Sequence, residues 1–209
     1  MTLDEWIESI LPVTQDTDWN IVFAETSSPF SAESSAKLIA SLDESFSISG
    51  ISNYLNAFIP VLLSSGSPES AFTQFLEFSK SYQKKFKKSF NWSHPITKSF
   101  VYVFGRSNFL AIRLKRNPEL ALELLESPFL YQKKNFLEME KGLRKRLEKQ
   151  PKYSLAEFKS VLRCFKYEEF LRITVRDLAE LCPFEETLEE LSSVAICCPR
   201  ESLSFVTYL

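Results

Sequence analysis

The chain has 209 residues, of which 44% are hydrophobic and 25% charged, as in ordinary globular proteins. Its formal net charge of -2 provides no overall attraction to nucleic acid or to anionic membranes. No segment reaches the ~20 uninterrupted apolar residues of a membrane span, and the acidic start MTLDEWIESILP lacks the basic region of a signal peptide. These features predict a cytoplasmic protein.

The cysteines and the histidine provide no metal site. The four cysteines are Cys164, Cys182, Cys197 and Cys198, and their spacing matches no zinc-binding pattern. The single histidine, His94, lies far from them in sequence. We expect reduced, partly buried thiols, and no metal or cofactor in this chain.

The N-terminal part predicts short helices separated by turns. Thr2 and Glu5 form a capping box for a helix that ends at Pro12. The apolar run 19–23 is either a short strand or an anchor. Another helix begins at Ser31 and presents Ala36, Leu38, Ile39 and Leu42 inward.

Helical spacing continues from Ile51 to Leu63, and the Ser-Gly-Pro-rich loop 64–68 follows. Ser67 is the expected cap of the next helix, and Pro68 occupies its first position. That helix is predicted to run from Glu69 to about Phe90.

A basic cluster, 84–88, lies near the end of this helix and is followed by Phe90 and Trp92. Lysines interleaved with aromatics are typical of nucleic-acid surfaces, but lysines at a helix C-terminus also offset the helix dipole. The balanced overall charge favours the second interpretation. His94 lies in a turn without a nucleophile nearby, which favours a capping or surface role over catalysis.

Two helices are predicted around a Phe-Gly-x-Ser segment. The first begins at Ile96 and stops at Gly105, and Ser107 caps the second. A short helix from Pro118 to Leu125 then precedes a longer one from Phe129 to about Lys149.

The helix 129–149 is predicted to be amphipathic. Its expected inner residues are Phe136, Leu137, Met139, Leu143 and Leu147. Its outer side carries Lys133, Lys134, Lys141, Arg144, Lys145, Arg146 and Lys149. Such a face is commonly only solvated; the alternative is a patch for an acidic partner or for nucleotide phosphates.

The segment 160–192 organises the rest of the chain. Ser154 and Glu157 form a second capping box that starts a long amphipathic helix. A break at Pro183 precedes another helix that opens with acids, and 202–209 forms an apolar tail. The cations Arg163, Lys166, Arg172 and Arg176 are predicted either to pair at helical spacing with Glu168, Glu169, Asp177 and Glu180 or to face a partner. The pairing is the favoured interpretation.

Two separated motifs carry a resemblance to a known family. The downstream motif contains Leu162-Arg163-x-Phe165-Lys166, Glu169-x-Leu171-Arg172-Ile173, Arg176-Asp177-Leu178, and then Thr187, Leu188, Glu190, Leu191 and Ser192. The upstream motif contains Val103-Phe104-Gly105-x-Ser107-x-Phe109-Leu110 and Leu114-x-Arg116-x-Pro118-Glu119-Leu120. In this order the motifs resemble the glutamine synthetase adenylyltransferase/deadenylylase family, over roughly 71–195.

The resemblance implies a parent enzyme that attaches AMP to a tyrosine of glutamine synthetase and removes it. Such an enzyme uses ATP and Mg²⁺ and is regulated by the PII protein and by glutamine. Members have a Gly-Ser turn followed by an Asp-x-Asp pair, whose carboxylates hold the metal ions. Here Gly66-Ser67 is followed by no such pair, and the pair Asp16/Asp18 has no Gly-Ser before it.

We therefore expect an all-α bundle of antiparallel helical hairpins, with about ten helices in a single helical domain or fragment 1–209 and a possible boundary near 64–68. The resemblance identifies it as the non-catalytic helical region before a nucleotidyltransferase domain, which would be a partner together with glutamine synthetase. The candidate partner-facing residues are Arg163, Lys166, Arg172, Arg176, Arg144 and Lys145. The alternatives are a stand-alone helical interaction module and, third, a nucleic-acid binder.

Overall fold

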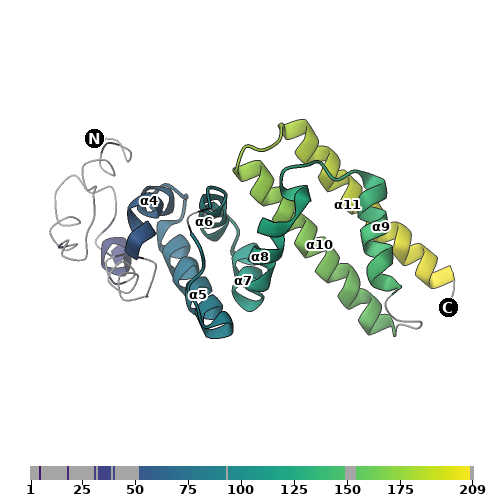
Figure 1. Cartoon of the computed structure of the whole chain (residues 1–209), viewed down its shortest axis with the longest axis horizontal. Helices are drawn as coiled ribbons and strands as arrows, with labels where there is room; N and C mark the ends of the chain where they lie inside the picture. Colours follow the sequence, from purple (N-terminus) through teal and green to yellow (C-terminus); the bar gives the residue numbers. More distant parts are fainter. Residues whose placement is uncertain are drawn as a thin grey trace. The chain divides into compact units, whose positions relative to one another are not determined.

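A computed structural model describes Glu5, Asp18, Ser31, Ala40 and residues 33–38, 52–92, 94–148 and 154–207, without the side chains of 52–56. All regular secondary structure in these residues is helical, which confirms the all-α prediction (Figure 1). The predictions for Thr2 and for 19–23 lie outside the described residues. The chain divides into two compact units, Met1–Ala121 and Leu122–Leu209. The predicted single domain stays a prediction.

The described helices follow one another with short connections. They are α4 (Ser52–Leu63), α5 (Pro68–Phe86), α6 (Thr97–Arg106), α7 (Asn108–Arg116), α8 (Glu119–Glu126), the 3₁₀ turn η1 (Pro128–Leu130), α9 (Phe136–Leu147), α10 (Leu155–Leu178) and α11 (Phe184–Thr207).

An aromatic cluster fills the core of the first unit, in which α5 packs against α6 and α7. Trp92 lies at its centre, and its ring contacts Phe78 and Phe90 edge to face at centroid separations of 5.8 and 4.7 Å. Phe75 and Phe104 extend the cluster across α5 and α6. Edge-to-face aromatic pairs stabilise beyond the area that they bury, so the abundant phenylalanines of this sequence account for the core.

The helix predicted for 69–90 ends earlier, at Phe86. Lys87 adopts a left-handed conformation with φ 57°, which terminates α5 and redirects the chain. Phe90 then becomes buried. Pro68 occupies the first turn as predicted, but Ser67 makes no side-chain capping bond. His94 has the predicted local role, because its Nδ1 accepts a hydrogen bond from the Ile96 amide.

The role of Gly105 differs from the predicted one, which was to end the helix. It lies within the last turn of α6, which continues to Arg106. A Cβ placed on Gly105 would lie 2.3 Å from the Ser65 Oγ and 2.4 Å from its Cβ. Ser65 is fully buried, and its hydroxyl donates to the Leu62 carbonyl over 2.7 Å. Glycine therefore permits close approach of α6 to the end of α4. The Ser107 cap of α7 is confirmed, because its Oγ accepts from the Leu110 amide.

The helix predicted for 129–149 is wrong at its start. The chain forms the η1 turn and an extended segment before α9 begins at Phe136. Asn135 caps α9 in a reciprocal capping box with Glu138, a start signal that competed with Pro128. Leu137, expected inside, is 70% exposed.

In the second unit, α10 and α11 form an antiparallel hairpin that packs against α9. The capping box of Ser154 and Glu157 is confirmed. At the open end of the hairpin, the rings of Phe158 and Phe205 stack at 3.9 Å. The apolar core consists of Met139, Leu143, Phe165, Ile173, Val194 and Cys197. The predicted tail after Pro199 is wrong, because α11 continues to Thr207.

We predict that Gly105→Ala lowers the free energy of unfolding by about 1–3 kcal/mol, because the new methyl group overpacks against Ser65. Gly142→Ala is the matched control, since its Cβ would meet only the Lys134 Nζ at 3.9 Å. It should instead stabilise by up to about 1 kcal/mol, the helix-propensity gain of alanine.

Urea titration of both variants measures these changes. In a Ser65→Gly background, Gly105→Ala should lower the free energy of unfolding much less than it does in the parent. An equal cost in both backgrounds would show that the contact with Ser65 is not the cause.

Candidate functional site

Two arginines of the family-like motif lie buried on α10. Arg172 and Arg176 are 5% and 1% exposed, and they are four residues apart, one helical turn. The Arg172 Nη1 donates to the Phe129 carbonyl and the Arg176 Nε to the Leu130 carbonyl, each over 3.2 Å. Both arginines thereby hold the η1 turn, and these bonds explain why helix does not begin at Phe129.

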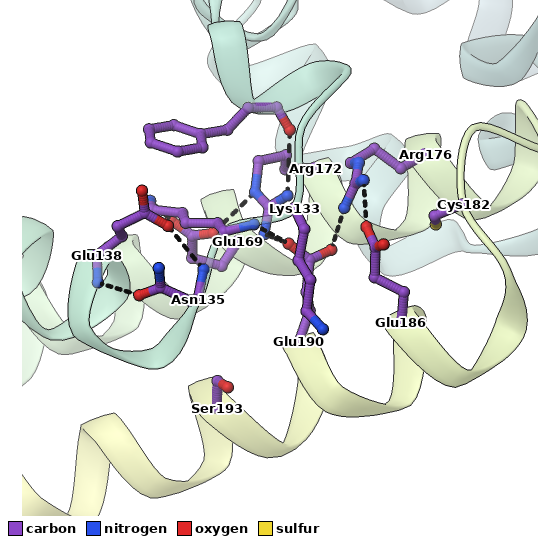
Figure 2. Close-up of polar contacts among 12 residues, drawn as sticks. Lys133, Asn135, Glu138, Glu169, Arg172, Arg176, Cys182, Glu186, Glu190 and Ser193 are labelled. Carbon is purple, nitrogen blue, oxygen red and sulfur yellow. Dashed lines mark hydrogen bonds and ion pairs between the residues drawn. The ribbon is translucent and has the colours of Figure 1, made fainter.

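Glu190 of α11 is the common counter-ion of both arginines (Figure 2). Its side chain is completely buried. One carboxylate oxygen accepts from Arg176 Nη1, and the other accepts from the Lys134 amide over 2.8 Å. Arg172 Nη2 also lies 2.8 Å from Glu190, but its orientation does not suit a hydrogen bond, so this contact is an ion pair. Glu190 thus joins α10, α11 and the segment before α9.

Further carboxylates complete the charge balance around Glu190. Arg172 Nε donates to Glu169 over 2.9 Å, and Lys134 pairs with the same carboxylate. Arg176 Nη2 donates to Glu186 over 2.5 Å. Although burial alone would lower the pKa of Arg176, Glu186 and Glu190 raise it above its ordinary value. Arg176 therefore stays charged inside the unit. We call Lys134, Glu169, Arg172, Arg176, Glu186 and Glu190 the buried ion network.

The predicted helical-spacing pairs form only in part. Arg172 pairs with Glu169 as expected, whereas Arg176 pairs with carboxylates of α11. Two of the other predicted acids have different partners: Glu168 pairs with Arg146, and Asp177 accepts a hydrogen bond from the Thr187 hydroxyl. Sequence reasoning missed the role of Glu190. The available signal was its place on the apolar side of α11, four and seven residues before Val194 and Cys197.

The remaining candidates lie at the surface. Arg144 is exposed, yet its Nε donates to Glu201 over 2.8 Å, and this bond raises its pKa. Lys145 is exposed on the outer side of α9. Arg163 and Lys166 are exposed on α10, where the Lys166 ammonium lies 5.5 Å from the Phe170 ring centroid. Partner contact by these residues stays a prediction.

The chemistry available to the described residues is limited. No group of three or more His, Cys, Asp or Glu side chains among them is arranged to hold a metal ion. The four cysteines are free thiols, and burial raises the pKa of Cys197 to about 11, which keeps it neutral. None of the described helices is long and apolar enough to cross a membrane.

We predict that Glu190→Ala lowers the free energy of unfolding by about 3–5 kcal/mol, because two buried arginines lose their common counter-ion. Glu189→Ala is the matched control. The Glu189 side chain is 63% exposed and, among the residues that the structure describes, pairs only with exposed Lys133, so its loss should cost less than about 1 kcal/mol. Urea titration followed by circular dichroism compares the two; equal effects would contradict the assignment.

The carboxyl group of Glu168 leads to a prediction of how the free energy of unfolding depends on pH. Burial raises its pKa above the ordinary 4.5 more strongly than Arg146 lowers it. A carboxyl with a raised native pKa contributes stability below its unfolded pKa, and this contribution is lost as the pH rises through the native value. Glu168→Gln should therefore match or exceed the parent in stability at about pH 7, and this advantage should vanish near pH 3. Urea titrations at both pH values test this, and a variant weaker at neutral pH would overturn it.

Comparison with known proteins accords with these features. A family model described as "Glutamate-ammonia ligase adenylyltransferase" matches residues 97–206. The "Bifunctional glutamine synthetase adenylyltransferase/adenylyl-removing enzyme" of Nitrosococcus oceani is 32% identical over 111 residues, which are 53% of this chain and 11% of that protein. No solved structure matches significantly. Because the matched region covers more than half of the sequence and contains α6 to α11, the chain belongs to the glutamate-ammonia ligase adenylyltransferase family.

Proposed function

We propose that this chain is the helical region that precedes the first nucleotidyltransferase domain of a bifunctional adenylyltransferase, and that it is not catalytic by itself. The matched relative is named for adenylyl transfer and removal, and the match covers only 11% of its length. The sequence lacks a Gly-Ser turn followed by an Asp-x-Asp pair. Together these observations favour a supporting segment over an active site.

The observation that carries this proposal is the use of Arg172 and Arg176. Arginines that contact a nucleotide must present their guanidinium groups to it. Here both groups are buried and donate to carbonyls of η1 and to Glu169, Glu186 and Glu190. The family-like pattern thus supports the α10–α11 hairpin as a rigid base on which a catalytic domain can be mounted.

The remaining expectations follow from the parent enzyme. ATP and Mg²⁺ would bind in its nucleotidyltransferase domain, whose carboxylates hold the metal. Glutamine synthetase would be the protein substrate, and PII and glutamine would act through the parent. The proposed location is the cytoplasm.

A stand-alone helical interaction module is the second candidate, and the exposed apolar side of α11 favours it. Sequencing the gene beyond the Leu209 codon separates the two. An open frame that encodes Gly-Ser and Asp-x-Asp supports the enzyme segment. A stop codon at that point supports the module.

We predict that the purified 209-residue chain incorporates no AMP from labelled ATP into glutamine synthetase and releases none from the adenylylated form. The Nitrosococcus oceani enzyme is the positive control. Labelled AMP, bound or free, is the measured quantity. Turnover above background with the chain alone would refute the non-catalytic assignment.

A further inference from the structure

One side of α11 carries apolar residues that no described element covers. They recur at spacings of three and four, so they form one stripe along the helix. We define the α11 outer face as Phe184, Leu188, Leu191, Ala195, Pro199, Leu203 and Val206, and all seven are exposed. Leu203 is 68% exposed.

The opposite side of α11 is already the core side. Glu190, Val194 and Cys197 are buried there against α9 and α10. A helix that only covers a core has one apolar side and one polar side. Since α11 has a second apolar side along its length, this side is suited to a binding partner.

The edge of this face toward α10 is basic. The rings of Phe158 and Phe205 stack, and Lys166 is close enough to Cys198 to lower its pKa, although burial raises that pKa more. Lys166 therefore lies beside α11. Lys159, seven residues earlier, is on the same side of α10, and Arg163 lies between them. These three exposed cations have no carboxylate partner among the described residues.

The edge of the face toward α9 is neutralised instead. Glu189 pairs with Lys133, and Arg200 lies 3.3 Å from Glu140. Beside Leu188 there is a shallow hollow of about 460 Å³, lined by Lys133, Asn135, Phe136, Leu188, Glu189, Ser192 and Ser193. It is wide enough to receive a bulky side chain. Among the described residues, uncompensated positive charge thus borders the α11 outer face on the α10 edge.

We propose that the α11 outer face binds an amphipathic helix of a separate protein, one that carries carboxylates along one flank. A helix fits because side chains three and four residues apart interlock with the same spacing on a second helix. The carboxylates would lie against Lys159, Arg163 and Lys166.

Charge disfavours two other occupants. A second copy packed antiparallel about a two-fold axis sets identical edges against each other, which brings the cationic α10 edges together. An anionic membrane would meet cations on one edge but the carboxylate of Glu185 toward the other. An acid-flanked helix matches the charge asymmetry of the face.

The test uses two synthetic peptides of 24 residues, the length of α11. Both carry leucines at the spacing of the face; one has glutamates along one flank and the other has lysines at the same positions. Fluorescence anisotropy with the whole chain should give at least about tenfold tighter binding of the glutamate peptide at about 0.05 M salt. This preference should collapse at about 0.5 M salt.

Substitutions place the binding on the face. Leu203→Glu should weaken the binding of the glutamate peptide at least about tenfold. Leu137→Glu, at a leucine that is 70% exposed on α9, should leave this binding unchanged. The double change Arg163→Glu and Lys166→Glu should reverse the preference between the peptides, and Lys145→Glu should leave it unchanged. All five substituted residues are exposed, so circular dichroism should show folded variants.

Several results would overturn the proposal. They are equal affinity for both peptides, no binding of either, equal effects of Leu203→Glu and Leu137→Glu, or a concentration-dependent dimer that Leu203→Glu abolishes. Co-sedimentation with phosphatidylserine vesicles that is lost in Leu203→Glu would assign the face to a membrane. The peptide assay needs no catalysis, so its failure is distinct from a failure of the proposed function.

Discussion

The second unit depends on one carboxylate, that of Glu190. It offsets the charges of two arginines of α10 and accepts a hydrogen bond from the backbone amide of Lys134, before α9. Each of these groups would be costly to bury alone, whereas together they are compensated. Because the arginines also bind the carbonyls of Phe129 and Leu130, the position of η1 follows from the same network. Three helices and their connecting segment are therefore oriented by charge as well as by apolar packing.

The two units reach stability by different means. The first relies on interlocking rings around Trp92 and on the close contact that Gly105 permits. The second has a smaller apolar core, and buried ion pairs help to fix how α10 and α11 lie against each other. This difference separates two classes of cation in the family-like motif. Arg172 and Arg176 are buried inside the unit. Arg163 and Lys166 lie at the surface, where a partner can reach them.

The sequence was sufficient wherever the signal was local. Capping boxes act within one helical turn, so Ser154 with Glu157 marked the start of α10 correctly, and helical periodicity was enough for the all-α class. Periodicity failed at 128–135, where apolar and basic residues continue the helical spacing. What breaks that helix is a set of bonds from arginines more than forty residues later. The counter-ion role of Glu190 was hidden for the same reason, since α10 and α11 must first fold back on each other.

Pro199, within α11, has no amide hydrogen, so the carbonyl of Ala195 lacks the donor that an uninterrupted helix would supply. Both residues are exposed on the same side of the helix, where water can solvate this oxygen. Any molecule that covers this point must bring a donor of its own or trap a water molecule there, since a dehydrated carbonyl without a partner is costly. A serine, threonine or asparagine at the centre of an otherwise apolar surface would meet this need.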